Sequence, residues 1–284
     1  MKVHIVDAST RSLHELPVSW LVFHGGEPHV NVTPELAAAV AGQNVLIDVR
    51  GGSFAELGNA AVMIDALRRL HAAWVGLFTP YLPGARQDRG VPLTCVVYAD
   101  FINSLAFAAV FGVDPHSLVM PSHIERFVEV ELSEIVRGHS IFAGATHIIC
   151  PDQGAGKRTE SVADALGLPV VYARKHRDPL TRELSGFVCE PVPEGAVAVI
   201  VDDICDGGRT FLGVAAAARV PAANLRLWTT HGIYSYGCDL FDGVFSQVHS
   251  TDSFHEQGHA KATLTLLQHP VVLNKIINST LYTR

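Results

Sequence analysis

Apolar residues along the chain fall into short runs that polar or glycine-rich segments separate. Short runs rich in valine and isoleucine are typical of buried strands, whereas apolar residues three or four positions apart are typical of helices. On this basis we expect strands at residues 3–7, 20–24, 29–33, 45–49, 74–79, 117–120, 147–150, 170–173, 197–201, 225–229 and 244–248. We expect helices at 56–71 and 94–111, before Leu166, and in the alanine-rich run after Thr210. Strands that alternate with helices in this way predict an α/β fold with mainly parallel sheets.

The strand expected at 197–201 ends in two adjacent carboxylates, Asp202 and Asp203. Because neighbouring residues on a strand point to opposite sides, the two can share one ligand only where the strand turns into a loop. Gly207 and Gly208 let the backbone turn its N–H groups toward an anion, and the following helix N-terminus adds a favourable dipole. The pattern therefore predicts a loop that holds a sugar phosphate, with the carboxylates on ribose hydroxyls. The alternative is a plain strand–turn–helix connection in which Asp206 caps the helix.

A second group of polar residues follows the strand expected at 74–79. Arg86, Gln87 and Arg89 offer planar donors that suit phosphate oxygens and the edge of a purine. The alternative is a solvated loop with an internal pair between arginine and Asp88, which contributes little to stability.

Composition narrows the class of protein. A chain of 284 residues with 48% hydrophobic content can bury a large core, and its length indicates about two domains. With 21 basic and 28 acidic residues it offers no basic surface by composition, so we expect no nucleic-acid partner. No run approaches a membrane span, so we expect no membrane association. The five scattered cysteines, without C-x-x-C spacing, fit a reducing cytoplasm.

One competing motif is present near the C-terminus. Residues 255–259, His-Glu-Gln-Gly-His, match the zinc-protease pattern H-E-x-x-H. That pattern requires a helix, which Gly258 weakens, and a third metal ligand, for which only His269 remains. We therefore do not favour a zinc protease.

The stretch 197–211 resembles the phosphoribosyl-diphosphate loop shared by phosphoribosyltransferases and ribose-phosphate pyrophosphokinases. Residues 63–69, Pro80-Tyr81 and 85–89 resemble the pyrophosphokinases specifically. The resemblance extends from about Phe23 to Thr251. It implies two phosphoribosyltransferase-like α/β domains with mainly parallel central sheets, at 1–138 and 139–284. The last segment is a candidate for packing back on the first domain.

The resemblance also implies a reaction. The β,γ-diphosphate of ATP would pass to the C1 hydroxyl of ribose 5-phosphate and give phosphoribosyl diphosphate and AMP. The residues implied for ATP binding are Phe23, Glu27, Arg86, Gln87 and Arg89. Those implied for ribose 5-phosphate are Asp202, Asp203, Asp206, Gly207, Gly208, Arg209 and Thr210. Catalysis is assigned to Lys175 and Arg177, and Mg²⁺ to His123 and Asp152.

The choice of His123 depends on the expected strands. The family carries its metal-binding histidine in an Asp-Leu-His triplet, which Asp114-Pro115-His116 imitates. We choose His123 because it follows the strand expected at 117–120, whereas the triplet precedes that strand. Since ligands bind beyond the carboxyl ends of strands, the residue after the strand is favoured.

Four positions depart from the family pattern, at Gly25, Pro121, Ala155 and Arg209. Arg209 stands where the family usually has the last loop glycine. If Gly207 and Gly208 supply the unusual backbone angles, Arg209 keeps a negative φ, and we expect its guanidinium to contact the 5-phosphate. The alternative is that it faces solvent on the first turn of the helix.

Two other functions stay open on the sequence. A phosphoribosyltransferase would use the same phosphate loop but would not need Arg86, Gln87, Lys175 or Arg177. A non-catalytic regulatory subunit of the same family is the second alternative. The resemblance implies a homo-oligomer built from dimers, with a hexamer as one option.

Overall fold

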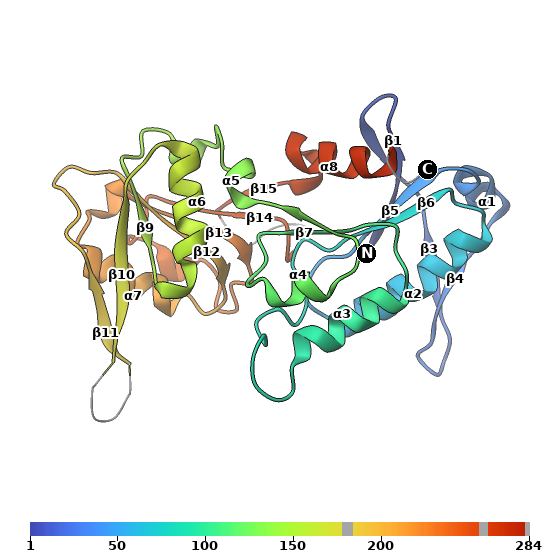
Figure 1. Cartoon of the computed structure of the whole chain (residues 1–284), viewed down its shortest axis with the longest axis horizontal. Coiled ribbons are helices and arrows are strands. Elements are labelled where there is room, and N and C mark those ends of the chain that lie inside the picture. The colour runs from blue at the N-terminus through green and yellow to red at the C-terminus, as the bar shows by residue number, and fades with distance from the viewer. Residues whose placement is uncertain (178–183, 256–260, 282–284) are drawn as a thin grey trace. The chain divides into compact units, whose positions relative to one another are not determined.

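The computed structural model describes residues 1–177, 184–255 and 261–281 (Figure 1). Contacts divide the chain into two compact units, Met1–Val130 with Leu267–Arg284, and Glu131–Leu266. Each unit has a central sheet flanked by helices, and most neighbouring strands in both sheets are parallel. The predicted α/β fold with mainly parallel sheets is therefore confirmed. None of the described helices is long and apolar enough to cross a membrane.

The sheet of the first unit has the strand order β2-β1-β5-β6-β7-β8. Strand β1 is antiparallel to both of its neighbours, and the pairs from β5 to β8 are parallel. The strands are β1 (Lys2–Asp7), β2 (Ser12–Glu15), β5 (Asn44–Asp48), β6 (Trp74–Phe78), β7 (Val110–Val113) and β8 (Phe127–Val130). The strands expected at 20–24 and 29–33 are present as β3 (Ser19–Val22) and β4 (Pro28–Asn31), which pair as an antiparallel hairpin. The helices are α1 (Pro34–Val40), α2 (Phe54–Arg69), α3 (Thr94–Ser104) and α4 (Val119–His123).

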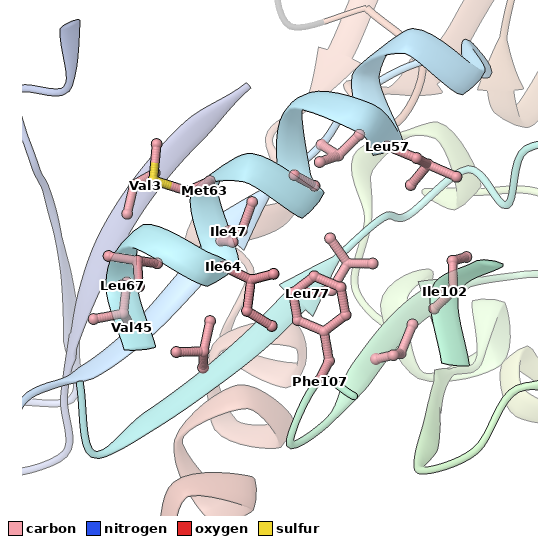
Figure 2. Packing of buried hydrophobic residues seen from close by; sticks show 14 of the residues in the cluster. Val3, Val45, Ile47, Leu57, Met63, Ile64, Leu67, Leu77, Ile102 and Phe107 are labelled. Carbon is pink, nitrogen blue, oxygen red and sulfur yellow. The ribbon is translucent and has the colours of Figure 1, made fainter. Parts of the chain in front are cut away.

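Helix α2 packs its apolar stripe on this sheet. Leu57, Ile64 and Leu67 lie at helical spacing and are buried against strand residues that include Ile47 and Leu77 (Figure 2). Ser53 caps the helix N-terminus, since its side chain accepts a hydrogen bond from the N–H of Ala55. The core of the first unit thus follows the periodicity of the sequence.

The helix expected at 94–111 is only half right. Helix α3 ends at Ser104, and Ala106 takes a left-handed φ of 51° that breaks the helical path. The Arg68 guanidinium donates to the carbonyls of Leu105 and Ala106, both at 2.7 Å. Residues Val110–Val113 then form β7, fully buried between β6 and β8. The strand expected at 117–120 is wrong, because that segment begins helix α4.

The sheet of the second unit has the order β11-β10-β9-β12-β13-β14-β15. Its strands are β9 (His147–Cys150), β10 (Val170–Arg177), β11 (Leu184–Cys189), β12 (Ala198–Cys205), β13 (Leu225–Gly232), β14 (Gln247–Thr251) and β15 (Ala262–Leu264). Among the described strands of this sheet, β11 alone is antiparallel to its neighbour. The helices are α5 (Leu132–Ile135), α6 (Gly156–Leu166) and α7 (Arg209–Ala218). Short 3₁₀ turns lie at Ser140–Phe142, Gln153–Ala155, Ala222–Asn224, Asp239–Phe241 and Leu266–Gln268.

Strand β12 separates two cores. Ala198 and Ile200 face the cluster that contains α7, whereas Val199 and Val201 face the cluster that contains α5 and α6. This alternation is the period-two pattern of a strand buried on both faces. It explains why the sequence of β12 is apolar throughout until Asp202.

The C-terminal segment returns to the first unit. After β15, helix α8 (Pro270–Leu281) packs on β1 and β8, and the Lys275 ammonium donates to the Glu129 carbonyl at 2.9 Å. The division between the units falls after Val130, earlier than expected, because β8 completes the first sheet while α5 packs on α6.

We predict that His249 makes unfolding depend on pH. Burial, followed by the charges of His139 and Arg226, lowers the pKa of His249 to about 4. Its ring meets that of His139 edge-on, with ring centroids 5.3 Å apart. As the pH falls from the ordinary histidine range toward 4, the unfolded chain binds a proton on this residue that the folded chain does not, so stability is lost over that interval. His249→Gln should therefore lose less stability between neutral pH and about pH 5 than the wild type in urea titrations. An equal loss in both proteins would contradict the assignment.

Candidate active site

The loop between β12 and α7 has a left-handed turn that favours glycine. Gly208 precedes the first helical residue with φ 74° and ψ −10°. A Cβ at this position would lie 2.7 Å from a Leu240 methyl carbon and 2.9 Å from the Phe241 ring. Arg209 starts the helix and is not among the residues with positive φ. The expectation is confirmed for Gly208, which takes the unusual angle, and for Arg209, which does not, but Gly207 has no positive φ.

The same loop is fastened to the loop that follows β13. The carbonyl of Cys205 accepts hydrogen bonds from the N–H groups of Ile233 and Tyr234, at 2.8 and 3.0 Å. The Ser235 hydroxyl donates to the Asp206 carboxylate, and the Ser235 N–H donates to the Asp206 carbonyl. The alternative in which Asp206 caps the helix is wrong, because the N-cap residue is Gly208, which has no side chain. Asp206 instead joins two loops at the carboxyl edge of the sheet.

Asp202 and Asp203 lie inside β12, whereas we expected them just beyond the strand. Arg158 from α6 reaches both, at 3.8 Å from Asp202 Oδ1 and 3.6 Å from Asp203 Oδ2. Burial, and then the neighbouring charge of Asp203, raise the pKa of Asp202, and the Arg158 guanidinium opposes them. The sequence did not identify Arg158, since its approach depends on β9 and β12 being neighbours in the sheet.

Asp152, after β9, and Lys175, within β10, form an ion pair. The Lys175 ammonium lies 2.7 Å from Asp152 Oδ2, and both side chains are partly exposed. The other carboxylate oxygen of Asp152 accepts hydrogen bonds from the N–H groups of Gly154 and Ala155. Arg177 ends β10, but its side chain lies outside the part of the chain that the structure describes. The catalytic roles of Lys175 and Arg177 stay predictions.

In the first unit, Arg86, Gln87 and Arg89 follow β6 as expected, with exposed side chains. The Arg89 guanidinium lies 3.4 Å from Asp88, yet it is 90% exposed, so this pair adds little to stability. Burial raises the pKa of Asp88. The Ser117 hydroxyl, the Arg89 guanidinium and the His116 ring together lower it by more, so the pKa of Asp88 lies below its ordinary range. The loop therefore presents basic groups around an ionised carboxylate.

The argument for His123 as the metal-binding histidine is wrong. His123 ends helix α4, and its Nδ1 lies 2.8 Å from the Val119 carbonyl. The strand that was to precede it does not exist, because 110–113 form the strand instead. Asp114-Pro115-His116 follows β7 directly, so His116 occupies the carboxyl end of a parallel strand.

Phe23 and Glu27 lie at the turn of the β3–β4 hairpin. The Phe23 N–H donates to the Glu27 carbonyl at 3.0 Å, and the Phe23 side chain is 52% exposed. A Cβ on Gly25 would lie 2.5 Å from a Glu27 carboxylate oxygen. Because this oxygen ends an exposed, flexible side chain, Glu27 can move aside, so the contact does not explain the glycine at position 25.

Among the described residues, no three His, Cys, Asp or Glu side chains converge as a metal cage. Mg²⁺ usually binds through one or two carboxylates and the phosphates of a substrate, so a single carboxylate such as Asp152 fits it. The residues Glu256 and His259 of the H-E-x-x-H pattern lie outside the described part of the chain.

Comparison with known proteins decides the family. The family described as "Phosphoribosyl transferase domain" matches residues 124–219. The ribose-phosphate pyrophosphokinase of Vibrio parahaemolyticus is 30% identical over 220 residues, which are 71% of this chain and 68% of that protein. The chain belongs to the ribose-phosphate pyrophosphokinase family.

Other members of the family agree with this placement. The Vibrio vulnificus ribose-phosphate pyrophosphokinase is 31% identical over 211 residues, or 68% of this chain, which spans 65% of the length of that relative. A crystal structure of phosphoribosylpyrophosphate synthetase from Mycobacterium smegmatis matches 91% of this chain and 88% of its own chain, with a TM-score of 0.70 and 20% identity. That likeness shows the shared fold.

We predict that Gly208 is required for the folded loop. Gly208→Ala places a Cβ against Leu240 and Phe241 and forces a left-handed alanine, so the free energy of unfolding should fall by about 1–3 kcal/mol. Gly207→Ala is the matched control. Its Cβ would lie 3.2 Å from the Tyr236 ring, which is 75% exposed and can move aside. Denaturant titrations that give the two variants equal stability would contradict this account of the loop.

Proposed function

We propose that the chain is a ribose-phosphate diphosphokinase that transfers the β,γ-diphosphate of ATP to the C1 hydroxyl of ribose 5-phosphate. The observation that carries the proposal is the Lys175–Asp152 pair on the same sheet edge as the glycine loop after β12. A phosphoribosyltransferase would need the loop but not this lysine. The pyrophosphokinase names of the curated relatives also favour the proposal over both alternatives.

The second unit would bind the ribose phosphate. The Asp206–Thr210 segment would hold the 5-phosphate with backbone N–H groups and the N-terminus of the ten-residue helix α7. Arg209, on the first turn with an exposed side chain, would add a charge-assisted contact to that phosphate. Asp202 and Asp203 would accept hydrogen bonds from the ribose hydroxyls. The C1 hydroxyl would then attack the β-phosphorus in line, and AMP would leave.

The remaining groups would bind ATP and balance charge. Arg86, Gln87 and Arg89 would contact the nucleotide, with Phe23 and Glu27 at the hairpin turn as further contacts. Lys175 and Arg177 would stabilise the charge on the transferred phosphoryl group. When bound, Mg²⁺ would supply positive charge at the phosphate oxygens, and Asp152 would hold it. His116, at the carboxyl end of β7, replaces His123 as the proposed metal-binding histidine.

We further propose a cytoplasmic homo-oligomer built from dimers. All five cysteines, Cys95, Cys150, Cys189, Cys205 and Cys238, are free thiols, which supports a reducing compartment.

We predict that Lys175→Ala lowers kcat by about two orders of magnitude, because preorganised charge at the transferred group would be lost. The melting temperature should change little, since the pair with Asp152 is partly exposed. Arg174→Ala is the matched control, because it removes a neighbouring exposed cation from the other face of β10. A kcat for Lys175→Ala within a few-fold of that of the control would refute the catalytic role.

Product analysis tests the reaction itself. Purified protein incubated with ATP, ribose 5-phosphate and Mg²⁺ should form AMP and a ribose that carries a diphosphate, both identified by ³¹P NMR. Formation of ADP instead of AMP would show γ-phosphoryl transfer and would contradict the proposal. Release of diphosphate from phosphoribosyl diphosphate with a base, without AMP formation from ATP, would favour a phosphoribosyltransferase.

A further inference from the structure

Arg158 touches both carboxylates of β12 although these belong to opposite faces of the strand. Asp203 continues the face of Val199 and Val201, against which Val162 of α6 packs. Arg158 lies one turn before Val162 and therefore on the same side of the helix. This places the guanidinium beside Asp203, at 3.6 Å from its Oδ2.

Asp202 is brought to the same guanidinium by a local hydrogen bond. Its carboxylate Oδ1 accepts the N–H of Asp203 at 2.9 Å, so the group bends toward the following residue. Oδ1 then lies 3.8 Å from Arg158. The side chains of Arg158, Asp202 and Asp203 are only 11%, 15% and 7% exposed. The largely buried Arg158 guanidinium thus lies close to both carboxylates near the end of β12.

Two carboxylates this close and this buried resist being ionised together. Burial, and after it the charge of Asp203, raise the pKa of Asp202, and Arg158 is the cation that lowers it. A carboxylic acid that keeps its proton loses acceptor capacity and becomes a donor, so it would pair less well with sugar hydroxyls. A planar, permanently charged guanidinium suits two carboxylates better than the single point charge of a lysine.

We propose that Arg158 is a positioning residue for the ribose subsite, which holds Asp202 and Asp203 aligned and charged so that both accept hydrogen bonds from the ribose hydroxyls. This inference rests on the proposed function, since it takes ribose 5-phosphate as the ligand of these carboxylates. Arg158 itself acts through the two aspartates.

Burial disfavours the thiolate form of two titratable thiols near the pair. They are the thiols of Cys150 on β9 and Cys205 on β12. Burial raises the pKa of both thiols, and the charge of Asp202 adds to the effect. These two thiols therefore contribute little to the pH dependence of binding near neutrality, and the sugar phosphate contributes equally to wild type and variant.

The test is the dissociation constant of ribose 5-phosphate, measured by calorimetry across pH for wild type, Arg158→Gln and Arg158→Lys. Arg158→Gln should bind about tenfold or more weaker at neutral pH, because a buried charge pair has lost its partner. The ratio of the variant to the wild-type dissociation constant should shrink as the pH rises, because a higher pH favours the ionised carboxylates even without the arginine. The affinity of Arg158→Lys for ribose 5-phosphate should lie between those of the wild type and Arg158→Gln. This variant still tests the proposal if Arg158→Gln does not fold.

Lys157→Gln is the matched control, because it removes the adjacent exposed cation from the same turn of α6. It should bind like the wild type at every pH. A ratio for the Arg158 variants that is constant with pH, accompanied by a lower melting temperature, would show a purely structural ion pair and overturn the inference. Wild-type affinity in Arg158→Lys and in any folded Arg158→Gln would also overturn it.

The same measurements separate this inference from the proposed reaction. If the wild type binds ribose 5-phosphate and the pH-dependent loss occurs, but no AMP forms with ATP, the reaction is wrong and the role of Arg158 stands. If AMP forms and the Arg158 variants bind normally, the reaction stands and the role of Arg158 is wrong. A wild type that does not bind ribose 5-phosphate would overturn both.

Discussion

The second unit depends on the burial of two adjacent carboxylates at the end of its central strand. Taking two like charges out of water costs several kcal/mol for each ion, and their mutual repulsion adds to this cost. The fold accommodates them because β12 lies between β9 and β13, so that the helix after β9 can bring Arg158 to the strand end. The guanidinium offsets part of the cost, and the Asp203 N–H satisfies an oxygen of Asp202. Contacts of this kind are the basis for proposing that the two aspartates act together as acceptors.

The parallel arrangement of the strands gathers the other polar groups at the same edge. The loops after β9 and β12 carry Asp152 and the glycine turn, and β10, which lies between β11 and β9, carries Lys175. Backbone bonds from the loop after β13 to Cys205 fix the glycine turn in place. The chemistry of this edge is therefore distributed over segments far apart in the sequence, and it is the strand order that makes them neighbours.

The first unit shows where local pattern fails. The apolar run from Leu105 to Val113 suits a helix or a buried strand equally well by composition. The structure of this run follows from two sets of contacts. Arg68 donates to the carbonyls at the end of α3, and β7 pairs with β6 and β8. That single change moves the carboxyl end of a strand from residue 120 to Val113. It also moves the candidate metal-binding histidine from His123 to His116.

The sequence by itself determined the features that depend on neighbouring residues. Apolar runs located most strands, the spacing of Leu57, Ile64 and Leu67 located α2, and the pair Gly207-Gly208 located a turn that frees Arg209 to keep a negative φ. The doubled aspartate indicated where a ligand could bind. Tertiary structure alone decided the features that depend on residues far apart in the chain. The order of strands brought Arg158 to Asp202 and Asp203 and Lys175 to Asp152, because the energy of an ion pair depends on distance in space and not on separation along the chain.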